Sequence, residues 1–279
     1  MKMKKIQILF SLAFAIFTFG CTSEKDASFT DKCGGKAPGG AVGLLMDISR
    51  DYQLGLSTAN QIESDPKNYQ VLDSAKYATA YGYLYAIRNN ILNSGKVYYK
   101  NEFPWRIRII KNDSVLNAFC TPGGFIYVYT GIIKYLDNET QLAGVLGHEI
   151  AHADRRHGAN QMLKLYGLQA LIEIFTSGTT QQVATLAQNL LMLKFSRTDE
   201  TEADDYSVRY LLGTPYDPQG AKFFFQKIGG SQRVPEFLST HPNPDNRVNN
   251  IEATWSCLGS GGNKELFAQR YALFKASLP

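Results

Sequence analysis

Residues 144–160 have the sequence GVLGHEIAHADRRHGAN, which contains the pattern His148-Glu149-x-x-His152. On an α-helix the four-residue step puts both imidazoles on one face, one turn apart, where they can bind a single metal ion. A carboxylate beside such an ion, here Glu149, can take a proton from water. Only four histidines occur in the chain, and three of them fall within residues 148–157. The pattern therefore indicates a zinc site for metal-assisted amide hydrolysis.

The composition is that of a globular protein. The chain has 279 residues, of which 44% are hydrophobic and 19% are charged, so it is long and apolar enough to bury a sizeable core. The formal net charge of +4 is spread along the chain, without a block of Lys or Arg. These values argue against extensive disorder and against a nucleic-acid partner.

The beginning of the chain has the pattern of an export signal. Lysines near the start precede an apolar run over 6–20, which is shorter than the roughly 20 residues of a membrane-spanning helix. We therefore predict a cleaved signal peptide over 1–20. The sequence TFGC, which ends at Cys21, is similar to a bacterial lipobox and predicts lipidation of that cysteine, followed by a linker over 21–38. Ordinary secretion and an uncleaved anchor are the alternatives.

The cysteine count predicts one disulfide. With Cys21 lipidated, Cys33, Cys120 and Cys257 remain, which is an odd number for an oxidising compartment. Cys120 lies in a segment that we expect to be buried. We therefore predict a bridge between Cys33 and Cys257, with Cys120 as a free thiol.

The hydrophobic periodicity predicts an α+β protein that is mostly helical. The helix over 138–156 carries the histidine pattern and begins with Asn138 as its capping residue. A small sheet is expected beside this helix, and residues 39–279 are expected to form a single domain. The predicted helices cover 41–56, 69–93, 138–156 and one or two segments between 160 and 194, and the predicted strands cover 97–100, 106–111 and 125–130.

The segment 116–124 contains Pro122-Gly123-Gly124, which predicts a tight turn between two strands. By itself this pattern indicates only a β-hairpin. Beside a hydrolytic site, however, an edge strand there can pair its backbone with an extended peptide. On that interpretation Gly123, Gly124 and Phe125 are the predicted substrate-binding residues.

A catalytic zinc site needs a third protein ligand and one open position. His157 lies five residues after His152, which does not match the six-residue spacing of the zinc-protease class with a third histidine, so we reject it as a ligand. The segment after Ser196 predicts a helix on which Glu200 and Asp204 share a face. Two carboxylates on an inward face are costly to bury without a cation.

These motifs together resemble the M48 family of zinc metallopeptidases, and within it the soluble, exported lipoprotein members without helical repeats. The resemblance covers roughly residues 116–247 and rests on three motifs in the family's order. These are His148-Glu149-Ile150-Ala151-His152, Asn117-Ala118-Phe119 to Pro122-Gly123-Gly124, and Ser196-Arg197 through Glu200-x-x-Ala203-Asp204.

Residue by residue, the resemblance implies a zincin-like gluzincin domain with one Zn²⁺ per chain. His148, His152 and Glu200 are the implied metal ligands, Glu149 is the base, and Asp204 orients a ligand histidine. His241-Pro242 is similar to a segment found downstream in soluble members. It implies that His241 approaches the metal, either as a hydrogen-bond donor to the developing oxyanion or as a removable plug of the open position.

The implied function is a zinc endopeptidase of the bacterial cell envelope, lipid-anchored to the outer membrane on the periplasmic side. Its implied substrates are unfolded or misassembled envelope proteins, including outer-membrane proteins. Two alternatives from other classes remain. One is a non-catalytic chaperone or assembly factor with a zinc fold, and the other is a structural zinc protein with four permanent ligands. The presence of Glu149 argues against both, because structural zinc does not need a base.

Overall fold

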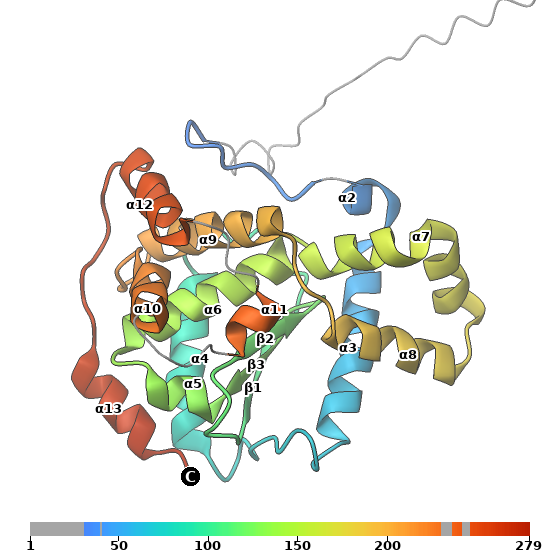
Figure 1. Cartoon of the computed structure of the whole chain (residues 1–279), viewed down its shortest axis with the longest axis horizontal. Coiled ribbons are helices and arrows are strands. Elements are labelled where there is room, and N and C mark those ends of the chain that lie inside the picture. The colour runs from blue at the N-terminus through green and yellow to red at the C-terminus, as the bar shows by residue number, and fades with distance from the viewer. Residues whose placement is uncertain (1–30, 40, 230–235, 242–245) are drawn as a thin grey trace, which may run out of the picture.

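The computed structural model describes residues 31–39, 41–229, 236–241 and 246–279 (Figure 1). The predicted signal peptide over 1–20 and the predicted lipidation site Cys21 lie outside the described residues. No helix in the described ranges is long and apolar enough to span a membrane.

Helices dominate the architecture, as predicted. The helices before the sheet are α2 (Ala41–Leu45), α3 (Ile48–Glu63) and α4 (Ala78–Leu92). Those after it are α5 (Thr130–Tyr135), α6 (Glu139–Asp154), α7 (His157–Ser177), α8 (Thr180–Leu191), α9 (Arg197–Leu212), α10 (Gly220–Gly229), α11 (Phe237–Thr240), α12 (Arg247–Cys257) and α13 (Ala268–Ala276).

A three-stranded sheet lies beside α6, which confirms the predicted α+β arrangement (Figure 1). Its strands are β1 (Arg106–Ile110), β2 (Ala118–Thr121) and β3 (Phe125–Tyr129), in the order β1-β3-β2. β1 runs parallel to the central β3, and β2 runs antiparallel to it in the predicted hairpin. Gly123 and Gly124 both have φ +75°, a conformation that glycine adopts without strain. Because β2 lies at the end of the order β1-β3-β2, it is an edge strand, and it packs against α6.

α6 is the central helix of the core, because all of its residues are buried. Glycines let its neighbours approach closely. At Gly144 an added Cβ would meet the backbone of α10 at Gly220 and Ala221, and at Gly147 it would meet Ser207 of α9. The hydroxyl of Ser207 also donates to the carbonyl of Gly144 at 3.0 Å. These contacts fix α9 against α6, so residues on the two helices face each other.

Two predicted elements are wrong in the structure. Residues 97–100 form turns instead of a strand, because the backbone amides of Tyr98 and Tyr99 donate to the buried carboxylate of Asp154 at 3.0 and 2.7 Å. The helix predicted from 69 begins only at Ala78. Before it, the amide of Leu72 donates to the carbonyl of Ile109, so this segment lies beside β1. In both places a contact with a distant residue overrides the local pattern.

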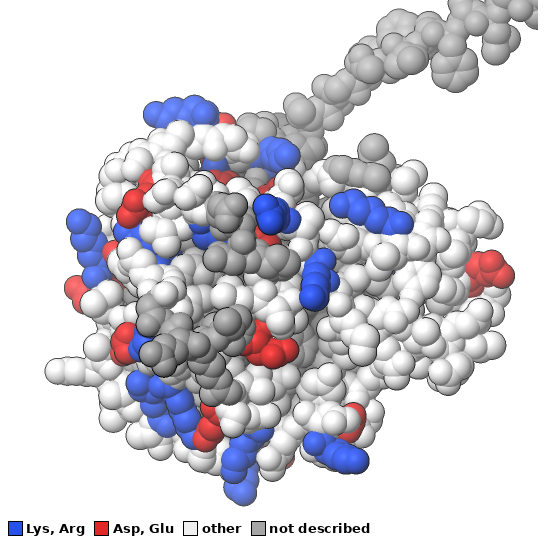
Figure 2. All heavy atoms as spheres, in the orientation of Figure 1, with Lys and Arg blue, Asp and Glu red and all other residues white. Residues whose placement is uncertain are grey.

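The predicted helical region between 160 and 194 folds as α7 and α8, with a kink at Gly167, where φ is 74°. Within 158–193 the only charged residues are Lys164 and Glu173. Figure 2 accordingly shows mainly uncharged side chains over these two helices. Leu165 and Ile172 on α7 are 62% and 44% exposed.

The N-terminal segment over 31–39 is held against α9 and α12. A disulfide joins Cys33 to Cys257 at the end of α12, with a Cα–Cα distance of 5.8 Å, and Cys120 is a free thiol, as predicted. The guanidinium of Arg209 donates to the carbonyl of Cys33 at 2.7 Å. The hydroxyl of Tyr206 accepts from the amide of Lys36 at 2.7 Å.

Candidate active site

α6 positions the two histidines and the glutamate of the predicted motif. Its N-cap is Asn138, whose side chain accepts from the amide of Gln141 at 3.0 Å, as the sequence predicts. The helix then runs without interruption to Asp154. His148 and His152 are one turn apart on the same face, and their Nε2 atoms are 3.0 Å from each other.

α9 brings the predicted carboxylates to the same place. Ser196 and Asp199 form a capping box at its start, and Glu200 lies in its first turn. Because α9 packs closely on α6, the buried Glu200 carboxylate lies against both histidines. Its Oε2 is 3.3 Å from His148 Nε2, and its Oε1 is 3.4 Å from His152 Nε2.

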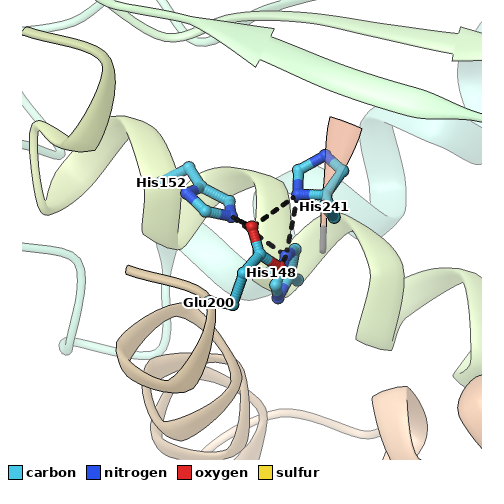
Figure 3. Close-up of side chains that lie close together, drawn as sticks. All are labelled: His148, His152, Glu200 and His241. Atoms are coloured by element: carbon cyan, nitrogen blue, oxygen red, sulfur yellow. Dashed lines mark hydrogen bonds and ion pairs between the residues drawn. The ribbon is translucent and has the colours of Figure 1, made fainter. Parts of the chain in front are cut away.

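His241, which follows α11, completes a group of four. Its Nδ1 is 3.3 Å from His148 Nε2 and 3.1 Å from Glu200 Oε1. Figure 3 shows the imidazoles of His148, His152 and His241 and the carboxylate of Glu200 pointing toward one another. One ligand atom from each of these four residues lies within 4.8 Å of the other three. The structure thus brings together four of the residues predicted from the sequence.

The donor set and its spacing fit a zinc ion. Tetrahedral coordination with Zn–N and Zn–O bonds of about 2.0–2.2 Å places neighbouring ligand atoms about 3.3 Å apart. The five contacts given above between atoms of the group are 3.0 to 3.4 Å long, close to this edge length. Glu200 Oε2 and both carboxylate oxygens of Glu149 are buried and have no hydrogen-bond partner among the described residues. Buried groups in this state are those that a cation and a water molecule can satisfy.

A second layer of charge surrounds this group. Asp204 Oδ1 accepts from His148 Nδ1 at 2.9 Å, so the Nε2 lone pair of His148 faces the other ligand atoms. Arg247 on α12 donates to both oxygens of Asp204 at 2.6 and 2.5 Å, and its Nη1 is 3.2 Å from Glu200 Oε2. Burial opposes the charge on Asp204, but the Arg247 guanidinium and the bond from His148 hold its pKa below the usual value.

The pKa of Glu149 is shifted in the opposite direction to that of Asp204. It is buried and follows His148 on α6, and burial raises the pKa of its carboxyl above the usual 4.5. The neighbouring His241 and His148 oppose this shift, and His241 Nε2 is 3.5 Å from Glu149 Oε1. A buried carboxyl group with a raised pKa is suited to accepting and returning a proton.

A pocket of about 250 Å³ opens beside the four-residue group. It is bounded by the edge strand β2, by His152 and His241, and by the end of α8. Most of its lining is apolar or aromatic. The lining residues are Tyr69, Val115, Asn117, Phe119, Cys120, Thr121, Pro122, Tyr129, His152, Ala153, Arg156, Gly158, Leu190, Leu191, Leu193, Phe195, Glu236, Thr240 and His241.

The three predicted substrate-binding residues lie outside the lining of this pocket. From the hairpin segment over 116–124 the lining contains Asn117 and Phe119 to Pro122. Phe125 is only 2% exposed and begins β3. Gly123 and Gly124 form the turn. An added Cβ on Gly123 would meet the backbone of α3, and one on Gly124 would meet the side chain of Trp105. The structure thus gives these residues a role in shaping the hairpin, and β2 itself faces the pocket.

Three other residues at the site had no predicted role. Phe195 stacks on the His152 ring with a centroid distance of 3.9 Å. Arg247 ends the sequence that starts at His241-Pro242, and its spacing gives no hint of the two carboxylates that it contacts. His157, which we had rejected as a ligand, lies behind His152, with its Nδ1 2.9 Å from the Nδ1 of that residue. The histidine-rich sequence itself was the available signal for this contact.

The helix pair, the small sheet and the His-Glu-x-x-His site define a zincin-like metallopeptidase fold. The chain belongs to peptidase family M48, because the family model "Peptidase family M48" matches residues 82–255. The match includes all four residues of the candidate ligand group, His148, His152, Glu200 and His241.

Curated relatives support this membership. The chain is 34% identical over 146 residues to a protein named mitochondrial metalloendopeptidase OMA1 from Arabidopsis thaliana, a match that covers 51% of this chain and 30% of the relative. It is 28% identical over 228 residues to a beta-barrel assembly-enhancing protease from Yersinia pestis, which covers 75% of this chain and 45% of the relative. The Escherichia coli (strain K12) protein of the same name is 33% identical over 162 residues, which covers 52% of this chain and 33% of the relative. The matches therefore span less than half the length of each of these relatives.

Proposed function

We propose that the chain is a zinc-dependent endopeptidase of the bacterial cell envelope that hydrolyses peptide bonds in unfolded or misassembled envelope proteins. The observation that carries this proposal is the convergence of His148, His152 and Glu200 beside the buried carboxylate of Glu149. Membership of peptidase family M48 supports it.

In this proposal His148, His152 and Glu200 hold one Zn²⁺. When bound, zinc polarises a carbonyl group and lowers the pKa of water to about 7. Asp204 holds His148 in the tautomer whose Nε2 is free to bind metal. Arg247 supplies a positive charge opposite Asp204 and Glu200, which keeps both carboxylates ionised in a buried site.

Glu149 acts as the general base and then as the general acid. It takes a proton from the attacking water and returns it to the nitrogen of the leaving amine as the peptide bond breaks. The raised pKa of its carboxyl, caused by burial, brings its proton affinity closer to neutral pH and so assists both transfers.

β2 is the proposed binding site for the peptide backbone. It is an edge strand, and residues Phe119 to Pro122 line the pocket next to the metal-binding group. Backbone pairing along such an edge binds an extended chain with little demand on its sequence, which suits unfolded substrates. Gly123, Gly124 and Phe125 contribute by shaping the hairpin that presents the strand.

His241 has two proposed roles. In this structure its Nδ1 lies at the distance of a fourth ligand atom, which supports the role of a removable plug. For catalysis the ring has to leave that position, because a catalytic zinc site keeps one position open. Once displaced, it can donate a hydrogen bond to the developing oxyanion.

The cellular location and the partners of the enzyme are also proposals. With the predicted export signal over 1–20 and the predicted lipidation of Cys21, we propose that the domain over 39–279 lies in the periplasm, tethered to the outer membrane through the linker over 21–38. The relatives named beta-barrel assembly-enhancing protease support outer-membrane proteins as substrates or partners. The alternative is a non-catalytic assembly factor with the same fold, which would not need the carboxylate of Glu149.

The test compares the full wild-type chain with Glu149→Gln for zinc content and for cleavage of denatured casein. Glu252→Gln serves as the matched control, because Glu252 is an exposed carboxylate on α12 that pairs with Lys222. We expect zinc in all three proteins and cleavage by wild type and the control alone, with a loss of at least about 100-fold for Glu149→Gln. Equal cleavage by Glu149→Gln would refute the role of Glu149. Zinc in all three proteins without any cleavage would favour the assembly factor.

A further inference from the structure

The two histidines of the motif differ in what lies behind them. The Nδ1 atom of His148 donates directly to a carboxylate, that of Asp204. The Nδ1 atom of His152 instead lies 2.9 Å from the Nδ1 atom of a second imidazole, that of His157. Nothing in the proposed mechanism uses His157, although this side chain is buried at the start of α7, directly behind a metal ligand.

The direction of the hydrogen bonds follows from the task of His152. An imidazole that offers Nε2 to a metal must carry its proton on Nδ1. The Nδ1–H of His152 therefore donates to His157 Nδ1, which must be the bare nitrogen of that ring. A neutral His157 then carries its own proton on Nε2, which lies 3.3 Å from Glu202 Oε2 and donates to it. The carboxylate of Glu202 thus sets the tautomer of both rings in turn.

Glu202 is itself fixed in place. The guanidinium of Arg155 donates to Glu202 Oε1 at 2.9 Å, and it stacks over the ring of Tyr206 at 4.1 Å. The same guanidinium donates to the carbonyls of Lys36 and Ala37 at 2.9 and 3.2 Å. The N-terminal segment therefore closes over the outer end of this series of contacts, while its inner end is the metal ligand.

We propose that His157 and Glu202 are positioning residues for His152, and that they fix its tautomer and ring orientation for metal binding through the series Glu202, His157, His152. The inference rests on the proposed metal site. It gives His152 the carboxylate support that His148 receives directly from Asp204, with one imidazole inserted between ring and carboxylate. Partners of this kind behind a metal ligand typically change metal affinity or activity by about 10–100-fold when they are removed.

The test measures the zinc affinity of the full chain by competition with a chelator. His157→Phe keeps an aromatic ring in the same space but removes both hydrogen bonds, so we expect zinc binding about 10–100-fold weaker than wild type. His157→Asn offers a carbonyl oxygen to the Nδ1–H of His152, so we expect it to recover at least half of that loss on a logarithmic scale. A role in packing alone predicts the reverse order, with Phe better than Asn, and that order would overturn the inference.

Glu202→Gln provides a second variant, because the Glu202 side chain is 27% exposed and its replacement leaves the buried rings in place. It removes the charge that orders the two tautomers, so we expect zinc binding weaker by about tenfold. Glu252→Gln is the matched control and should bind zinc as wild type does. Equal zinc affinity in wild type, His157→Phe and Glu202→Gln would overturn this inference alone, while a wild-type chain that binds no zinc would overturn the proposed function as well.

Discussion

Replacing Arg247 by methionine removes the buried cation that faces two carboxylates of the site. The guanidinium is about 1% exposed, donates to both oxygens of Asp204, and lies 3.2 Å from Glu200 Oε2. Methionine keeps much of the apolar contact with Phe225, over which the guanidinium carbon lies at 3.8 Å. The change therefore isolates the loss of charge and hydrogen bonds at nearly constant packing.

The size of the effect follows from burial. Removing one partner of a buried ion pair leaves an uncompensated charge and costs about 3–5 kcal/mol. Lys222→Met is the control, because Lys222 pairs with Glu252, whose side chain is 49% exposed, and such a pair contributes about 0–1 kcal/mol. We expect the free energy of unfolding of the metal-free chain to fall by about 3–5 kcal/mol in Arg247→Met and by about 0–1 kcal/mol in Lys222→Met.

Urea unfolding in the presence of a chelator measures both variants, since a bound metal ion would otherwise compensate the negative charge that Glu200 retains when Arg247 is replaced. Equal slopes against urea concentration for all proteins are needed for the comparison. A loss below about 1 kcal/mol for Arg247→Met, no larger than that of the control, would refute the assignment of Arg247 as the counter-charge of this site.

Two further predictions concern Glu202 and the contact between α6 and α10. Burial opposes the charge on Glu202, but the hydrogen bond from His157 and the charge of Arg155 lower its pKa from 4.5 to about 2. Its stabilising effect is thus fully present above about pH 5 and is lost as the pH falls toward 2. The difference in unfolding free energy between wild type and Glu202→Gln should therefore shrink as the pH falls from about 5 to 2, and a constant difference over that range would contradict this. Gly144→Ala should lower the free energy of unfolding by about 1–3 kcal/mol, because the added Cβ meets the backbone of α10. Gly82 on α4 has open space around it, so Gly82→Ala should raise the free energy of unfolding by about 0.5–1 kcal/mol. Similar changes for both variants in thermal unfolding would contradict the close packing of α6 on α10.

The helices that build the site could be predicted because their signals are local. Asn138 and Ser196 cap helices that begin at the next residue, and the four-residue spacing of the histidines fixes their common face. The disulfide between Cys33 and Cys257 was also predictable, since few cysteines remained to choose from. Local sequence was sufficient for the helices, and the number of cysteines was sufficient for the disulfide.

The rest depends on contacts between distant segments. Residues 97–100 alternate like a strand, but the carboxylate of Asp154 takes up backbone amides there. Arg247 reaches the site because α12 packs on α9, which no spacing in the sequence shows. His157 was judged only as a possible ligand, and its contact with the back of His152 depends on the turn between α6 and α7, where Arg156 has φ 60°.

The most direct test of the central claim is removal and return of the metal in the full wild-type chain. His148, His152 and Glu200 should hold one zinc per chain, so dialysis against a chelator should abolish cleavage of denatured casein, and one equivalent of zinc should restore it. The same titration with Glu200→Gln should restore little, because a ligand is missing. Full cleavage by wild-type protein whose measured zinc content is near zero would contradict the account.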